Sequence, residues 1–279
     1  MNSFKKVFEF YIQSNLHVAI AVWCLSMITG LYFNIDAYSS ALFLGLSTFV
    51  AYNTITFQKY RAAAIKKEVK TWFYSNRKLL FILNFLALYK LVTLVFYIHY
   101  ISLIAIFPFI LLTALYMLRI IKIKGQRYSL RSIPGLKIFS IAISWAGLVT
   151  FLPLIENSVV LGARTWIFFI QQFLFVLALA LPFDIRDMDF DMSNLKTIPL
   201  VLGLKKTKYF AILILLSITV NSFFAFGSHL SVIFAITNTV LALFIWCSKK
   251  GQAKYYASFF IEAVPIFWFL LLYIYTMIA

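Results

Sequence analysis

The stretch from Leu181 to Gly203, LPFDIRDMDFDMSNLKTIPLVLG, holds four of the nine acidic residues of the chain within eight positions. On a helix, the i, i+3, i+7 spacing of Asp184, Asp187 and Asp191 places three carboxylates on one face. Like charges this close repel each other unless a cation lies between them. Mg²⁺ prefers carboxylate oxygens and bridges them to substrate phosphates, so the spacing favours a magnesium and phosphate site. The alternative interpretation is a solvated acidic loop.

Two further charged residues fall inside apolar segments. Lys90 lies near the middle of the apolar run 79–98, and Glu262 lies in the first third of the run 256–278. Ionisable groups within a bilayer are costly and usually face a cavity or a partner. We therefore expect both side chains to face a cavity, where they either pair with each other or leave Glu262 to accept a proton beside a substrate.

The composition of the chain is that of a membrane protein, so membrane-spanning segments must position these residues. Hydrophobic residues make up 63% of the 279 residues and charged residues 12%, with a mean hydropathy of +0.92. In soluble domains, about 45–50% of the residues are hydrophobic and about 25% are charged. A membrane-spanning helix needs about 20 apolar residues. The chain contains nine such runs: 17–34, 40–57, 79–98, 100–118, 136–154, 165–183, 209–226, 230–247 and 256–278. Long apolar runs are unlike the alternating pattern of a membrane β-barrel, so we expect one all-α polytopic domain over residues 1–279.

The loops show a strong charge asymmetry. With nine spans, 23 of the 25 Lys and Arg residues fall on the N-terminal side of the membrane, Arg164 falls on the other side, and Lys90 lies within a span. Cytoplasmic loops collect Lys and Arg, which predicts a cytoplasmic N-terminus. The net charge of +16 then reflects topology, so we expect membrane lipid as a partner and no nucleic acid. The expected location is a bacterial inner membrane, with the Asp-rich site on the cytoplasmic side.

The end of the sixth span and the residues that follow it resemble a motif of a known family. The DxxDxxxD pattern ends the sixth of nine spans and is followed by Lys196-Thr197-Ile198-Pro199 and Gly203. This arrangement resembles the second aspartate-rich motif of the UbiA superfamily of intramembrane prenyltransferases. The span count, the topology and the long loops after spans two, four and six are also similar to that family, so the resemblance covers the whole chain.

The resemblance implies a ring of nine helices around a central cavity open toward the membrane. Two aspartate-rich motifs, on spans two and six, would hold Mg²⁺ against an isoprenyl diphosphate. Ionisation of the diphosphate would give an allylic cation that alkylates a lipophilic acceptor. On that template Asp184, Asp187 and Asp191 are the metal ligands, and Lys196 contacts the diphosphate.

The chain departs from the family in the first motif. The family pattern is close to NDxxDxxxD, and the equivalent segment here is AYNTITFQKYRA, from Ala51 to Ala62. Asn53 is in register, but Thr54, Phe57 and Arg61 occupy the three aspartate positions. Lys59 and Arg61 could bind phosphate oxygens directly in place of a metal. The alternative interpretations are membrane anchors for these two cations and a helix-end hydrogen bond for Asn53.

A third segment, from Leu115 to Lys137, lies between spans four and five. Family members resemble it in having a Tyr at the end of span four and basic residues soon after. Tyr116 with Lys122 and Lys124 fits this pattern, and Tyr128 with Arg131 fits it in a second register. These residues would close over the diphosphate, and ordinary loop charge is the alternative.

The sequence therefore predicts a Mg²⁺-dependent membrane prenyltransferase that moves an isoprenyl group from a polyprenyl diphosphate to an aromatic or quinone-like acceptor. Two alternatives remain open: a terpene cyclase of the same type, and a non-catalytic isoprenoid-lipid-binding protein with a degenerate first motif. A transporter built on Lys90 and Glu262 is a further reading, but the sequence shows no inverted repeat that would support it.

Overall fold

The computed structural model describes residues 3–61, 67–118, 120–123, 126–189 and 196–278. Its elements are α1 (Ser3–Gln13), α2 (Leu16–Phe33), α3 (Tyr38–Arg61), α4 (Lys67–Val95), α5 (Tyr100–Met117), β1 (Ile121–Ile123), β2 (Gln126–Tyr128), η1 (Leu130–Ser132), α6 (Leu136–Glu156), α7 (Ala163–Asp187), α8 (Ile198–Leu202), α9 (Leu204–Ala225), α10 (Ser228–Cys247), η3 (Tyr256–Ile261) and α11 (Val264–Ile278). Among the described residues, nine helical segments are long and apolar enough to cross a bilayer, as the apolar runs predict.

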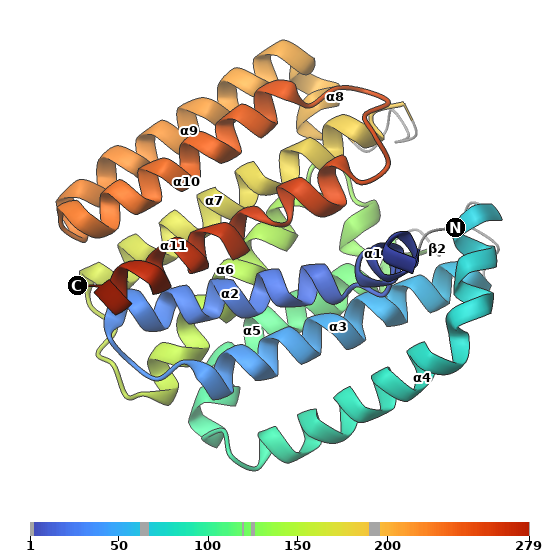
Figure 1. Ribbon diagram of the computed structural model, residues 1–279, viewed down its shortest axis with the longest axis horizontal. Coiled ribbons are helices and arrows are strands. Elements are labelled where there is room, and N and C mark those ends of the chain that lie inside the picture. Colours follow the sequence, from blue (N-terminus) through green and yellow to red (C-terminus); the bar gives the residue numbers. More distant parts are fainter. Residues whose placement is uncertain (1–2, 62–66, 119, 124–125, 190–195, 279) are drawn as a thin grey trace.

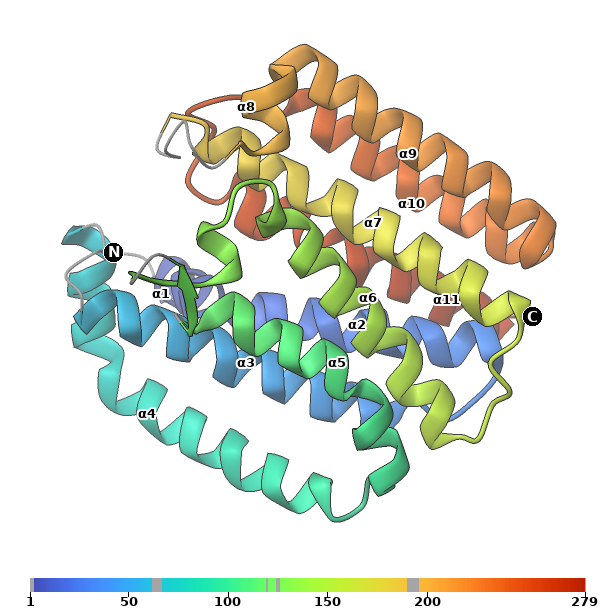
Figure 2. The same cartoon turned by 180° about the vertical axis from the view of Figure 1, so that it is seen from behind.

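The membrane-spanning helices run back and forth along one direction. The start of α1 and the C-terminal ends of α3, α5, α7 and α10 lie at one end of the molecule, and the C-terminal end of α11 lies at the other end (Figure 1 and Figure 2). We call the first end the basic end, because this alternation of nine spans assigns to it 23 of the 25 Lys and Arg residues.

Three spans differ from the apolar runs. The third begins at Lys70 and the seventh at Leu204, several residues earlier than hydropathy alone predicts. In both, polar turns rich in good helix formers extend the helix beyond its apolar part. The ninth span is not one continuous α-helix: its first part is the π-helix η3, and α11 starts after a break at Glu262 and Ala263 with Pro265 in its first turn. Proline is tolerated there because a first-turn N–H has no helical partner.

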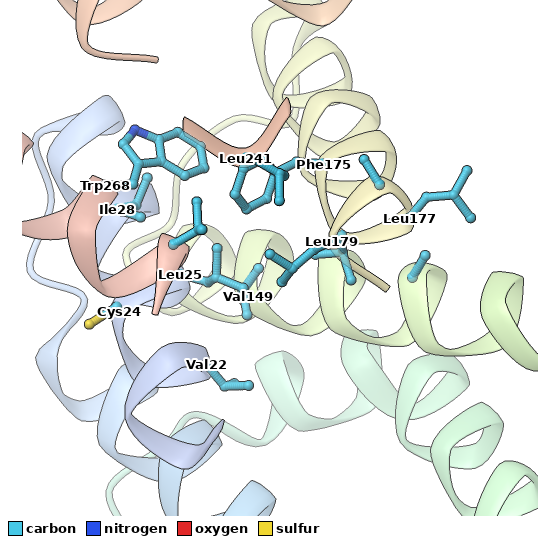
Figure 3. Packing of buried hydrophobic residues seen from close by; sticks show 14 of the residues in the cluster. Val22, Cys24, Leu25, Ile28, Val149, Phe175, Leu177, Leu179, Leu241 and Trp268 are labelled. Atoms are coloured by element: carbon cyan, nitrogen blue, oxygen red, sulfur yellow. The ribbon is translucent and has the colours of Figure 1, made fainter. Parts of the chain in front are cut away.

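The best-buried helices are α2, α6 and α7, whereas few residues of α4 and α5 are buried. Leu25 and Ile28 of α2, Val149 of α6 and Phe175 of α7 belong to one apolar cluster with Trp268 of α11 (Figure 3). The Trp268 ring packs against Phe175 and Phe234 at centroid distances of 5.1 Å and 4.7 Å. This core fixes the positions of α6 and α7, which carry the charged residues described below.

A short polar segment joins α5 to α6 at the basic end. Strands β1 and β2 pair antiparallel, with Ile121 opposite Tyr128 and Ile123 opposite Gln126. The 3-10 turn η1 follows, and Gly135 precedes α6 with a φ of 74°. The segment lies at the same end as the C-terminus of α7 (Figure 2). Apart from this hairpin, the described elements are all helical.

Helices α5 and α6 approach each other closely at Gly147. A Cβ built on Gly147 would collide with the ring of Phe109. Small residues at helix contacts in membranes permit such an approach. Gly147→Ala should therefore destabilise the protein by about 1–3 kcal/mol through overpacking, measured as unfolding in detergent. Phe109→Leu should restore part of the loss in the double variant, and additive effects of the two substitutions would contradict this packing.

Candidate functional site

A cavity of about 280 Å³ lies at the basic end. Polar side chains reach it from the turn between α1 and α2, from α3, α5, η1, α6 and α7, and from the first part of the ninth span. Its lining residues are Asn15, Tyr52, Ile55, Thr56, Tyr116, Arg131, Lys137, Ile138, Ile141, Trp145, Val176, Leu179, Ala180, Phe183, Asp184, Arg186, Asp187 and Glu262. We call it the charged cavity.

The end of α7 supplies two carboxylates to the charged cavity. Asp184 is buried and Asp187 is half-buried, one helical turn further on. Lys137 Nζ lies 2.7 Å from Asp184 Oδ1, and the side chains of this ion pair are only 13% and 4% exposed. Arg186 meets Asp187 through two bonds, Nε to Oδ1 at 2.8 Å and Nη2 to Oδ2 at 3.2 Å. Both carboxylates are thus engaged by cations of the protein.

Positive and negative side chains meet in the charged cavity. Arg131, Lys137 and Arg186 line it together with the carboxyl groups of Asp184, Asp187 and Glu262. A phosphate or diphosphate entering alone would compete with Asp184 and Asp187 for Lys137 and Arg186. A divalent cation entering with it would take the carboxylates and leave the guanidinium and ammonium groups to bind phosphate oxygens. The residues present therefore suit a metal–phosphate pair better than either ion alone.

An apolar cavity of about 310 Å³ adjoins the charged cavity. It is lined by α2, α3, α5 and α6, and the two cavities share five lining residues: Tyr52, Ile55, Tyr116, Ile141 and Trp145. Its other lining side chains are mostly aliphatic or aromatic, with a few hydroxyls. Together the two cavities offer a charged site for a polar head and an adjoining apolar site for a hydrocarbon tail.

Glu262 occupies the break between η3 and α11. The π-helical turn places it at the end of Tyr256–Ile261, where it lines the charged cavity with Asp184 and Asp187. Single π-helical turns are frequent at functional sites because the extra residue redirects a side chain. Lys90, by contrast, is exposed and lines an outward groove with α2 and α3. Lys90 and Glu262 thus line different hollows, which rules out the alternative in which the two side chains pair and leaves the one in which Glu262 accepts a proton.

Contacts from α1 and α2 hold the π-helical turn in place. His17 Nε2 lies 2.9 Å from the Phe259 carbonyl oxygen, and its Nδ1 lies 2.8 Å from the Tyr11 hydroxyl. A carbonyl only accepts, so Nε2 carries the proton, and the neutral ring then accepts from Tyr11. Burial raises the pKa of the Tyr11 phenol, which keeps it a donor. The ring of Phe8 packs edge-on against Phe259.

Asn53 fixes the turn that joins α1 to α2. Its amide donates to the Ser14 carbonyl at 3.1 Å and to the Phe49 carbonyl at 3.0 Å, and its oxygen accepts from Asn15 Nδ2 at 3.0 Å. Asn15 has a left-handed backbone, with a φ of 64°, and lines the charged cavity. Asn53 itself does not line that cavity, so it acts on the site through Asn15.

Asn53→Ala should lower the free energy of unfolding by about 2 kcal/mol, because it leaves the carbonyl of the buried Ser14 and the half-buried Asn15 amide without this partner. Unfolding in detergent measures the loss. Asn84→Ala is the matched control, since the Asn84 amide bonds to a carbonyl of its own helix at 2.7 Å. An equal loss in both variants would contradict the role of Asn53 in the turn.

Thr54 and Phe57, at two of the positions that the resemblance assigns to aspartates, lie on the face of α3 opposite the charged cavity. Thr54 and Phe57 line an outer groove between α3 and α4 together with Asn53. The charged cavity instead receives Tyr52, Ile55 and Thr56. In this register, acids at positions 54 and 57 would point away from Asp184. Helix α3 therefore gives the charged cavity no carboxylates to add to those of α7.

The comparisons with known proteins give no relative. The chain matches no protein-family model, no curated protein and no solved structure. Interpretation of the site therefore rests on its own geometry.

The other predicted site residues fall into three groups. Tyr116 and Arg131 line the charged cavity, so each of the two registers considered for the α5–α6 segment contributes one residue. Tyr128, Lys122 and Lys196 are described but are not among its lining residues, and both lysines are exposed. Asp191 and the side chains of Lys59, Arg61 and Lys124 lie outside the described residues.

Sequence reasoning missed two cations of the site. Lys137 was grouped with the loop charges, although a cation in the first turn of a helix opposes the helix dipole and so indicates a specific partner. Arg186 falls nearly opposite Asp184 on a helical wheel, but its long side chain pairs with the adjacent residue, Asp187. The helical spacing of the aspartates on α7 predicts neither the Lys137–Asp184 pair nor the Arg186–Asp187 pair.

Metal-ligand groups are sparse in the described part of the chain. No group of three His, Cys, Asp or Glu side chains there converges on one point. Asp184 and Asp187 form a two-carboxylate set one turn apart on α7. Two carboxylates suffice for Mg²⁺, which keeps several waters and takes its remaining ligands from substrate phosphates. The residues thus fit one hydrated Mg²⁺ that arrives with a phosphate ligand.

Proposed function

We propose that this protein is a membrane enzyme that uses an isoprenyl diphosphate, most simply a prenyltransferase of the UbiA type. The observation that carries the proposal is the junction of the charged cavity with the apolar cavity through five shared lining residues. An isoprenyl diphosphate has the matching form, with a strongly anionic head and a hydrocarbon tail. The resemblance of the segment 181–203 to an aspartate-rich motif supports the same substrate class.

The parts of the charged cavity take separate roles in this proposal. Asp184 and Asp187 would hold Mg²⁺, which would supply positive charge to the leaving diphosphate. Lys137 and Arg186 exchange their carboxylate partners for phosphate oxygens, and Arg131 adds a third cation from the cavity lining. The bond between the prenyl C1 atom and the diphosphate oxygen breaks, and the electron pair leaves with the diphosphate.

The allylic cation then needs stabilisation and a nucleophile. Tyr52, Tyr116 and Trp145 line both cavities, and aromatic faces stabilise cations. A carbon of an aromatic acceptor forms the new bond to C1, and the proton it loses passes to Glu262. The proposed setting is the cytoplasmic side of a bacterial inner membrane, with the basic end as that side and the nine spans forming a ring around the cavities.

Release of diphosphate from farnesyl and geranylgeranyl diphosphate by the purified protein in detergent tests this proposal. It should depend on Mg²⁺ and on a quinone-like or phenolic acceptor. Release without acceptor, with a cyclic hydrocarbon product, would favour a cyclase. Tight binding of the diphosphate without release would favour the second candidate, a protein that holds isoprenoid lipids. That candidate is supported by the α3 face, which gives the cavity no acids.

A further inference from the structure

The outer groove between α3 and α4 is a separate hollow of about 740 Å³. Its lining residues are Val50, Asn53, Thr54, Phe57, Tyr60, Phe73, Arg77, Lys78, Leu80, Phe81, Ile82, Asn84 and Leu88. None of them lines the charged or the apolar cavity, so α3 separates the groove from both.

The groove opens away from the core. Phe57 and Leu88 are about half exposed, at 46% and 47%, and Phe81 is 75% exposed. Both flanking helices are long and apolar enough to cross a bilayer. In a membrane, an apolar groove that opens outward at this depth is filled by lipid chains rather than by water.

Charge is concentrated at one end of the groove. Arg77 and Lys78 are exposed and are the charged members of its lining. The Arg77 guanidinium lies over the Tyr74 ring at 4.2 Å, which fixes its direction. The apolar part of α4 runs from Leu79 to Val95, or about 25 Å at 1.5 Å per residue, close to the hydrocarbon thickness of a bilayer. The two cations therefore lie at the level of the lipid headgroups.

We propose that the outer groove binds an anionic phospholipid from the leaflet at the basic end. Its phosphate meets Arg77 and Lys78, and an acyl chain lies in the groove along Phe57, Leu80 and Leu88. Two cations without an acid among the lining residues favour a lipid with net negative charge over a zwitterionic one. This site is independent of the function proposed for the cavities on the other face of α3.

Native mass spectrometry of the purified protein tests this binding, with phosphatidylglycerol and phosphatidylcholine of the same acyl chains. The wild type should retain phosphatidylglycerol on the order of tenfold better. Arg77→Gln/Lys78→Gln should remove the preference. Lys205→Gln/Lys206→Gln, which removes two neighbouring exposed cations from the first turn of α9 at the same end, should keep it.

A second variant tests the apolar part of the site. Thr54→Trp fills the groove and leaves Arg77 and Lys78 unchanged, so phosphatidylglycerol retention should fall severalfold; Leu88→Phe provides the same test if the first variant does not fold. Equal retention of the two lipids by the wild type would overturn the proposal. Equal loss in the α9 control, or full retention in the folded groove-filling variant, would also overturn it.

Discussion

Asp184→Asn and Asp187→Asn are each expected to reduce Mg²⁺-dependent diphosphate release on the order of 100-fold, the usual cost of losing a preorganised group that stabilises a leaving charge. Each substitution removes one carboxylate from a two-carboxylate set that lines the charged cavity. Asn and Asp side chains have nearly the same volume, so a loss of diphosphate release results from the removal of the negative charge. The measurement is initial rates of release from geranylgeranyl diphosphate over a Mg²⁺ titration.

Asp189→Asn is the matched control for these variants. Asp189 is an exposed aspartate two residues after Asp187, and its carboxylate pairs with Lys250 at 3.0 Å outside the charged cavity. It should keep release within about threefold of the wild type, because surface ion pairs contribute little. Equal losses in all three variants would indicate a general effect of charge at the basic end, and unchanged release in Asp184→Asn would contradict a metal role for that residue.

Much of the architecture could be predicted because a bilayer constrains it. The apolar runs locate nine spans, since a helix of fixed rise must cross a fixed thickness. Helical spacing also predicts that Asp184 and Asp187 share a face, and the structure brings both to one cavity. These features depend on residues close together in sequence, where geometry is set by the helix alone.

Features that depend on contacts between distant helices could not be predicted in this way. The partner of Asp184 is Lys137, 47 positions earlier and on another helix. The face of α3 that turns to the cavity follows from packing against α2 and α6, and it leaves Thr54 and Phe57 in the outer groove. The π-helical turn that directs Glu262 inward has no hydropathy signature, because its sequence, YASFFI, continues into the apolar sequence of α11.

Pairing of Lys137 with Asp184 is expected to contribute to stability as well as to the site. The side chains are 13% and 4% exposed, and the two atoms lie 2.7 Å apart. Lys137→Met leaves the buried carboxylate with one cation fewer, which should lower the free energy of unfolding by about 3–5 kcal/mol. Denaturant unfolding of the protein in detergent micelles measures this change.

Replacing both members of the pair separates stability from function. Lys137→Met/Asp184→Leu removes both charges, so it should recover most of the stability that Lys137→Met loses, because a buried pair exchanged for apolar side chains is often nearly neutral. The same double variant should release no diphosphate, since a metal ligand and a phosphate-binding cation are both absent. Additive losses of stability in the cycle would contradict a direct pairing. If the double variant recovers its stability and still releases diphosphate, the pair has a purely structural role and Asp184 takes no part in the chemistry.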